Sequence, residues 1–247
     1  MKIIPLSEGS FTVDKTKVFI PFDKSSDELQ QRAAGSLLVE IQPFAVVAKK
    51  DILLLDTGLG FHTKDGRMQL QQNLLDNGID PATVTKILLS HLHKDHAGGI
   101  QDTKKNSAEP VLAFPNATYY VNRKELAFAR ENKNASYIPE DFSLLNSSAK
   151  IVLLDDTGII DDYIHYEMSN AHCPYHTVYW IKENAETFFY GGDVAPQLQQ
   201  MKNRFIAKYD FDGRKSMELR TKWWELGKIE HWTFMFYHDI KSPTISL

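Results

Sequence analysis

The run Ser90-His-Leu-His-Lys-Asp-His96 constrains this chain more than any other segment. It places three histidines and one aspartate within six positions, directly after the strand-like stretch Lys86–Leu89 and before Ala97-Gly-Gly99. Imidazole nitrogens and carboxylate oxygens are the donors that Zn²⁺, Fe²⁺, Mn²⁺ and Co²⁺ accept in proteins. The alternative, surface histidines beside a helix-capping aspartate, gives no reason for all four groups to coincide. We therefore predict a metal centre at the end of a buried strand.

The spacing within this run divides its ligands into two pairs. His91 and His93 are two residues apart, so in extended backbone both side chains leave the same face and can share one ion. Asp95 and His96 follow the bend that the small residues after them permit, and they can reach a second ion beside the first. The run alone therefore predicts half of a cage for two metals.

Apolar runs of strand length recur along the chain and indicate buried β-strands. Helix-like segments lie between them: Gly66–Asn77, a segment from Asn122 to Arg130 with Glu125 as capping partner, and Asp212–Leu226 ending at Gly227. The pattern predicts an α+β fold in which two sheets pack face to face with helices outside. The expected strands are Ala45–Ala48, Ile52–Leu55, Ile87–Leu89, Thr118–Val121, Ile151–Leu154, Thr177–Ile181, Thr187–Tyr190 and Thr233–Tyr237, with a turn at Lys49-Lys-Asp51 between the first two.

Length and charge narrow the class of protein. The 247 residues contain no dividing linker, so we expect one domain over residues 1–247. The net charge of −4 argues against a nucleic-acid partner. The single cysteine, Cys173, cannot form an internal disulfide, and no apolar stretch is long enough for a signal core or a membrane span. We expect a cytoplasmic protein that binds neither nucleic acid nor membrane.

Five ordered motifs resemble the signature of the metallo-β-lactamase superfamily. The resemblance spans roughly Val46 to Asp239 and implies an αββα sandwich with the metals at one edge of its two sheets. The motifs are Leu54-Leu-Asp-Thr-Gly58, His91-Leu-His-Lys-Asp-His96, Ala171-His-Cys-Pro-Tyr-His176, Gly191-Gly-Asp193 and Phe236-Tyr-His-Asp239.

The resemblance implies a ligand set for two divalent ions, with zinc as the first expectation and Fe²⁺, Mn²⁺ or Co²⁺ as alternatives. Ordinary interpretations stay open for three of these residues. His172 can be a turn cap, Asp193 a turn residue at a strand end and His238 a core histidine. His176 is expected to be structural, while His62, His165 and His231 have no partner spacing. One ion would take His91, His93 and His172, the other Asp95, His96 and His238, and Asp193 would lie between the two.

Residues near these motifs have expected roles of their own. Asp56 ends an apolar strand, where a buried carboxylate needs a partner, and the free ring N–H of a ligand histidine is the expected one. Cys173 should point away from the centre because its neighbour His172 points toward it. For the pocket wall we consider Phe61, His62, Phe205, Tyr209 and Phe211, with Asp23–Gln31 as a mobile flap; plain surface packing is the alternative for all of them.

The implied activity is hydrolysis of a small-molecule substrate by a metal-bridging hydroxide, with Asp95 moving the proton. The pattern is closest to quorum-quenching lactonases and organophosphate hydrolases, which indicates a lactone, carboxylic ester or phosphotriester. The tyrosine that follows the bridging aspartate in lactonases is absent here, and Tyr175 or Tyr237 are the substitutes to consider. A glyoxalase-type thioesterase and a non-catalytic binding protein are the alternatives. The oligomeric state is left open, a homodimer being one option.

Overall fold

Two six-stranded sheets form the centre of the computed structural model, which describes residues 1–103, 109–146 and 148–247. The first sheet is ordered β1 (Lys2–Pro5), β5 (Phe44–Val47), β6 (Ile52–Leu55), β7 (Lys86–Leu88), β10 (Thr118–Asn122) and β11 (Ile151–Leu154). The second is ordered β12 (Thr157–Ile160), β13 (Ile164–Met168), β14 (Thr177–Glu183), β15 (Glu186–Tyr190), β16 (Thr233–Met235) and β17 (Thr244–Ser246).

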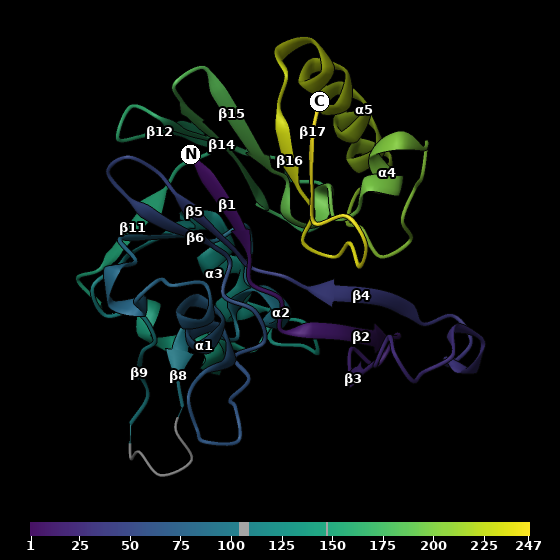
Figure 1. Ribbon diagram of the computed structural model, residues 1–247, viewed down its shortest axis with the longest axis horizontal. Helices are drawn as coiled ribbons and strands as arrows, with labels where there is room; N and C mark the ends of the chain where they lie inside the picture. Colours follow the sequence, from purple (N-terminus) through teal and green to yellow (C-terminus); the bar gives the residue numbers. More distant parts are fainter. Residues whose placement is uncertain (104–108, 147) are drawn as a thin grey trace.

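Helices cover the outer faces of both sheets (Figure 1). The first sheet carries α1 (Gln69–Asp76), α2 (Lys94–Ala97) and α3 (Arg123–Glu131), and the second carries α4 (Leu198–Lys202) and α5 (Gly213–Glu230). Short 3₁₀ turns lie at η1 (Leu29–Gln31), η2 (Pro81–Thr83), η3 (Pro139–Asn146) and η4 (Gly192–Val194). The architecture is therefore the αββα sandwich that the sequence predicts.

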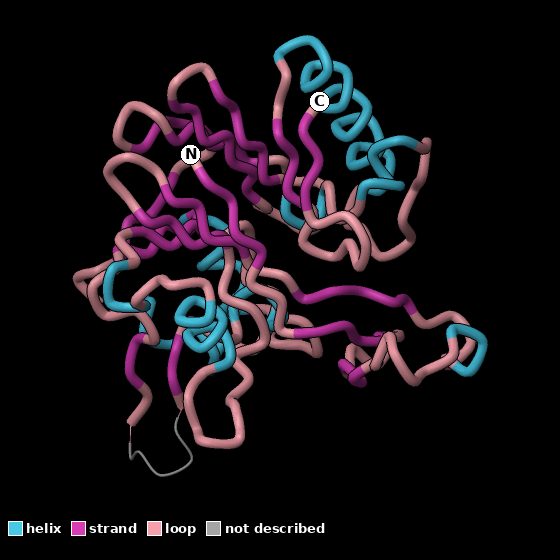
Figure 2. The backbone as a smooth tube through the Cα atoms, viewed as in Figure 1, coloured by secondary structure: helices cyan, strands magenta, loops and turns pink. Residues whose placement is uncertain are grey.

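A smaller sheet projects from this body as an arm, visible as an extended ribbon in Figures 1 and 2. It consists of β3 (Phe19–Pro21), β2 (Gly9–Val13) and β4 (Leu37–Ile41) in antiparallel order. A further hairpin pairs β8 (Gln101–Asp102) with β9 (Val111–Leu112).

Alternation along the strands builds the layers. In β6, Leu53 and Leu55 pack between the two sheets, whereas Leu54 faces the helices on the outer side, and all three are fully buried. The inter-sheet core continues across Phe44 and Tyr179. Burial on both faces explains why these strands read as unbroken apolar runs rather than as alternating ones.

All eight predicted strand runs form strands, and the three predicted helices are present. The predicted end of the last helix at Gly227 is wrong, because α5 continues to Glu230 and stops at His231 in the left-handed conformation. Gly227 lies inside the helix, where an added Cβ would meet the Phe234 ring at 2.4 Å. This glycine allows close packing against β16 rather than terminating the helix. In the part of the chain that the structure describes, no helix is both long and apolar enough to cross a membrane.

The segment after β6 approaches the segment after α2 so closely that only glycine fits. Gly60 has φ +73°, and a Cβ there would lie 2.2 Å from the carbonyl oxygen of Gly98. Gly66 has a similar φ of +86°, but nothing lies within 4 Å of its Cβ position. The two glycines therefore share the left-handed backbone and differ in the available space.

We expect Gly60→Ala to lower the free energy of unfolding by about 3 kcal/mol or more, because a rigid backbone contact must open. The matched control Gly66→Ala should cost only about 1 kcal/mol, the strain of an L-residue in the left-handed region. Chemical denaturation of both variants measures the difference. Equal losses would show that backbone strain alone, not the Gly98 contact, restricts residue 60 to glycine.

Candidate metal centre

Parallel strand pairing brings the predicted ligand segments to one edge of the sandwich. β6, β7 and β10 run parallel in the first sheet, and β15 and β16 run parallel in the second. Side chains that follow the carboxyl ends of parallel strands meet at one edge. His91 follows β7, Asp193 follows β15 and His238 follows β16, so segments distant in sequence converge there.

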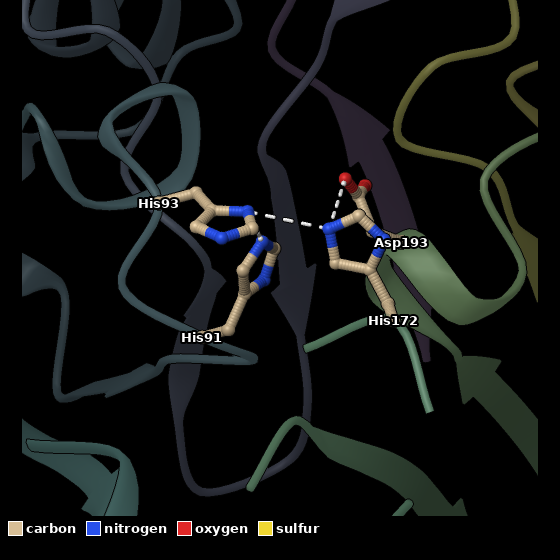
Figure 3. A group of neighbouring side chains, drawn as sticks. All are labelled: His91, His93, His172 and Asp193. Atoms are coloured by element: carbon tan, nitrogen blue, oxygen red, sulfur yellow. Dashed lines mark hydrogen bonds and ion pairs between the residues drawn. The ribbon is translucent and has the colours of Figure 1, made fainter. Parts of the chain in front are cut away.

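Four side chains form the first group (Figure 3). His91 Nε2 lies 2.9 Å from His93 Nδ1, which is 3.2 Å from His172 Nε2. The Asp193 Oδ2 atom lies 3.3 Å from that same His172 nitrogen. Three imidazole nitrogens and one carboxylate oxygen thus surround a common point.

The second group shares the Asp193 carboxylate. Its Oδ1 atom lies 3.0 Å from His238 Nε2 and 3.1 Å from His96 Nε2. Asp95 Oδ2 completes the group at 3.6 Å from His238 Nε2 and 3.8 Å from His96 Nε2. One oxygen of Asp193 therefore faces each group. All seven side chains predicted from the sequence come together, in the two sets that the resemblance implies.

Four of the five candidate ligand histidines form a hydrogen bond through Nδ1, which leaves the Nε2 atom of each ring facing the centre. His96 Nδ1 lies 2.8 Å from Asp56 Oδ2 and His172 Nδ1 lies 2.8 Å from Asp210 Oδ1, so both rings donate to carboxylates. His238 Nδ1 donates to the backbone carbonyl of Glu40 at 2.7 Å. A ring whose Nδ1 carries the proton offers its Nε2 as an acceptor, which is the form a metal requires.

His91 obtains the same tautomer through a relay. The Ser90 hydroxyl donates to Asp56 Oδ2 at 2.6 Å, so its oxygen can only accept from His91 Nδ1, 3.0 Å away. His93 is turned the other way and presents Nδ1 to the centre, while its ring meets Tyr137 edge to face at a centroid distance of 4.6 Å. Asp56 thus pairs with the ring N–H of His96, one of the predicted ligands, as expected.

Electrostatics favours cations at this point. Burial, reinforced by neighbouring imidazoles, lowers the pKa of His91 and of His93 well below the usual histidine value, so both rings are neutral at pH 7. Burial opposes ionisation of Asp193, but His238 and His96 hold the pKa of this carboxyl well below its usual range. Neutral His91 and His93 beside an ionised Asp193 have the protonation states in which such groups bind metals. Burial opposes protonation of His96 and His238, but Asp193 raises the pKa of both rings, so an ion at the second group would displace their Nε2 protons.

Two buried atoms that lie 3.1 Å from each other also lack a hydrogen bond of acceptable geometry. His96 Nε2 and Asp193 Oδ1 make no hydrogen bond to any described residue. Orphaned polar atoms at a fully buried site are costly unless something absent from the chain satisfies them. The five nitrogens and two carboxylates match the donors that zinc and its neighbours prefer. The residues therefore fit divalent metal ions.

Glu125 supports the candidate site, a role that the sequence did not predict. It was expected to cap α3, and Asn122 does accept from Glu125 N, but the Glu125 carboxylate instead accepts from Leu92 N at 3.0 Å and from the Tyr137 hydroxyl at 3.1 Å. It holds the backbone between His91 and His93. Burial raises the pKa of Glu125 to about 8, so it carries a proton at neutral pH.

Cys173 points away from the centre, as expected. Its sulfur lies 4.0 Å from Glu125 Oε1 and belongs to neither group of candidate ligands in the described chain. His176 is also buried outside the two groups, where its Nε2 accepts from the backbone N–H of Asp193 at 3.2 Å. His176 thus positions the shared aspartate. Asp210 was not anticipated, and the only signal for it is an aspartate in the connection after Asp193.

Neither tyrosine considered as a catalytic helper lines the cavity over the centre. The Tyr237 hydroxyl donates to the backbone carbonyl of Asp95 at 2.5 Å, and its ring stacks on His96. Tyr175 packs near Phe128 with φ +67°. Tyr209 does line the cavity, and its ring lies 6.1 Å from the His172 ring.

The cavity over the centre has a volume of about 340 Å³. Phe205 and Tyr209 line it as expected, whereas Phe61, His62 and Phe211 do not, and no residue of the expected flap Asp23–Gln31 does. His62 instead pairs with Asp102 at 2.9 Å. Another part of the cavity wall belongs to the arm, which the sequence pattern did not reveal. The arm contributes Val13, Lys17, Phe19, Leu37, Leu38 and Val39.

Known proteins are similar to this chain in sequence or in fold. The N-acyl homoserine lactonase AttM of Azorhizobium caulinodans is 30% identical over 112 residues, covering 42% of this chain and 38% of that relative's length. A probable metal-dependent hydrolase from Staphylococcus aureus has a TM-score of 0.79 and 19% identity, with 99% of this chain and 91% of that chain covered. AidC, described as a dizinc quorum-quenching lactonase, has a TM-score of 0.73 and 20% identity, with 98% of this chain and 88% of that chain covered.

A family model described as the metallo-beta-lactamase superfamily matches residues 41–233, which is more than three quarters of the sequence. The matched range includes every candidate ligand except His238. The chain therefore belongs to the metallo-beta-lactamase superfamily.

Proposed function

We propose that this protein uses a dinuclear metal centre to hydrolyse an ester-type bond in a small molecule, a lactone or carboxylic ester first and a phosphotriester second. The observation that carries the proposal is the shared Asp193 carboxylate, which presents one oxygen to each of two ligand groups at the base of a cavity. The similarity to proteins named as N-acyl homoserine lactonases supports the choice of a lactone.

The first ion would be held by His91, His93 and His172, and the second by Asp95, His96 and His238, with Asp193 between them. When bound, two divalent ions supply Lewis acidity and lower the pKa of water toward neutrality. Zinc is our first choice because five imidazoles and two carboxylates are donors that it accepts readily. Neither a serine nor a cysteine nucleophile is needed.

Asp95 has the position of a proton acceptor. Its side chain lines the cavity and remains 13% exposed, whereas the imidazole of His96 beside it is fully buried. Its contacts to His96 and His238 are longer than those of Asp193, which leaves its carboxylate freer to take a proton from the attacking water. The cavity wall would orient a substrate above the centre.

We predict that stripping divalent metals with a chelator abolishes hydrolysis and that adding back Zn²⁺ restores it. His172→Ala should lose most activity and roughly one equivalent of metal, because it removes a ligand from the first group. Elemental analysis and the zinc-dependent rise in unfolding temperature provide readouts independent of turnover. Full activity after stripping would refute a metal-dependent reaction.

A panel of lactones, aryl esters, phosphotriesters and acyl thioesters defines the bond that is cleaved. We expect lactones or aryl esters to be turned over with the highest kcat/KM. Exclusive turnover of thioesters would contradict the proposed substrate class. No turnover of any member by fully metal-loaded protein would contradict the proposed function itself.

We predict that Asp95→Asn lowers kcat by roughly 10²–10⁴-fold, because an amide cannot accept the proton that the carboxylate takes up. The remaining ligands should retain most of the metal, as elemental analysis would check. Asp155→Asn serves as a matched control, since the Asp155 side chain is 81% exposed and remote from the cavity lining. If Asp95→Asn keeps normal kcat at normal metal content, another group moves the proton.

A further inference from the structure

Two lysines line the cavity above the centre. Lys17 lies in the turn between β2 and β3, and Lys94 is the first residue of α2. Both are half-buried. Within the described residues, neither ammonium group lies within 4.0 Å of a carboxylate. The charge of Lys94 acts on the Asp141 carboxyl through space, but neither lysine forms an ion pair with a described residue. A partly buried cation without a paired anion costs free energy, so both positions call for an explanation.

Lys94 is held in place without being neutralised. Its ammonium lies 5.6 Å from the centroid of the Phe19 ring, within the range of a cation–π contact, and its backbone N–H donates to the Ser136 carbonyl at 2.8 Å. The aromatic ring orients the side chain from the arm, yet the positive charge stays available to a ligand in the cavity.

Lys17 is held by its backbone. It has φ +58°, a conformation that costs an L-residue about 1 kcal/mol, and its N–H donates to the Asp14 carbonyl at 3.0 Å. Its side chain lines the cavity together with those of His93 and His172 from the first ligand group. The turn therefore fixes this cation in the cavity wall.

The rest of the cavity offers no competing anion. Its only lining carboxylates among the described residues are Asp95 and Asp193, which face the candidate ion positions. The segment around α4 contributes uncharged polar groups to the lining, and the arm contributes apolar side chains. Ions bound at the centre would make the whole cavity still more positive. The uncharged polar residues are Gln197, Gln199, Gln200 and Asn203.

We propose that the substrate carries an anionic group, a carboxylate or a phosphate, separated by a short apolar spacer from the bond that is cleaved, and that Lys17 and Lys94 bind this group. The inference rests on the proposed function, because it assumes that the scissile bond lies at the metal centre. It goes further by assigning a charge to the substrate and a specificity role to two residues that touch no candidate metal position.

The test compares matched esters with the metal-loaded enzyme. 4-Nitrophenyl butyrate is the neutral substrate. Mono-4-nitrophenyl glutarate carries a terminal carboxylate on its acyl chain, and 4-nitrophenyl 4-phosphonobutyrate carries a terminal phosphonate there in place of a phosphate. The measured quantity is the kcat/KM of each anionic ester divided by that of the neutral one. Comparing the two anionic esters identifies which anion the lysines prefer.

We expect this ratio to exceed one in the unmodified enzyme and to fall roughly fivefold in Lys17→Gln and in Lys94→Gln, with the loss in KM rather than kcat. Lys15→Gln is the matched control: Lys15 lies in the same turn and is exposed and outside the cavity lining. Raising the salt concentration should lower the ratio in the unmodified enzyme, which keeps the test decisive if a variant folds poorly.

Three outcomes are distinguishable. A ratio that falls in both cavity variants but not in Lys15→Gln supports the proposal. Efficient hydrolysis of all esters with a ratio indifferent to both lysines and to salt overturns it, while the proposed hydrolase activity stands. Failure of the metal-loaded enzyme to cleave any ester, lactone or phosphotriester overturns the proposed function and this inference with it.

Discussion

The structure depends on one buried carboxylate, Asp56, at the junction of the two sheets. It accepts hydrogen bonds from the Ser90 backbone N–H at 2.7 Å, the Ser90 hydroxyl at 2.6 Å, the His96 ring at 2.8 Å and the Tyr190 hydroxyl at 2.5 Å. A fully buried carboxylate without such partners would be strongly unfavourable. These bonds tie the segment after β6 to the segment after β7 and to β15 of the opposite sheet. The same interaction that closes the sandwich therefore fixes the tautomers of His91 and His96.

Most of the fold and of the candidate site could be predicted from the sequence, because short segments of the chain already indicate them. The apolar strands read clearly since they are buried on both faces, and the ligand run is compact enough to identify without a fold. The remaining ligands needed the ordered motifs, because nothing local distinguishes His238 from a core histidine. The assignment of the seven side chains as metal ligands remains a prediction, although the structure brings them together.

What the sequence could not predict depends on long-range contacts. The strands of the arm are short and mixed in polarity, so their role as a cavity wall follows only from how they fold back over α2. Glu125 fits a capping pattern, but its carboxylate is buried beneath the ligand run and bonds Leu92 instead. Gly227 resembles a helix stop because glycine commonly follows the last residue of a helix. Its actual role, close packing against Phe234, depends on a contact that only the folded structure shows.

The division of the ligands between the two sheets has a further consequence. Asp95 and His96 belong to the segment after β7, whereas Asp193 and His238 follow strands of the second sheet. Ions held by both sides would favour the closed sandwich over any form in which the sheets separate, by mass action. Metal occupancy and sheet separation would then be linked equilibria. Depletion of metal would first loosen the interface between the two halves of the fold, so resistance to proteolysis would report the metal supply of the cell.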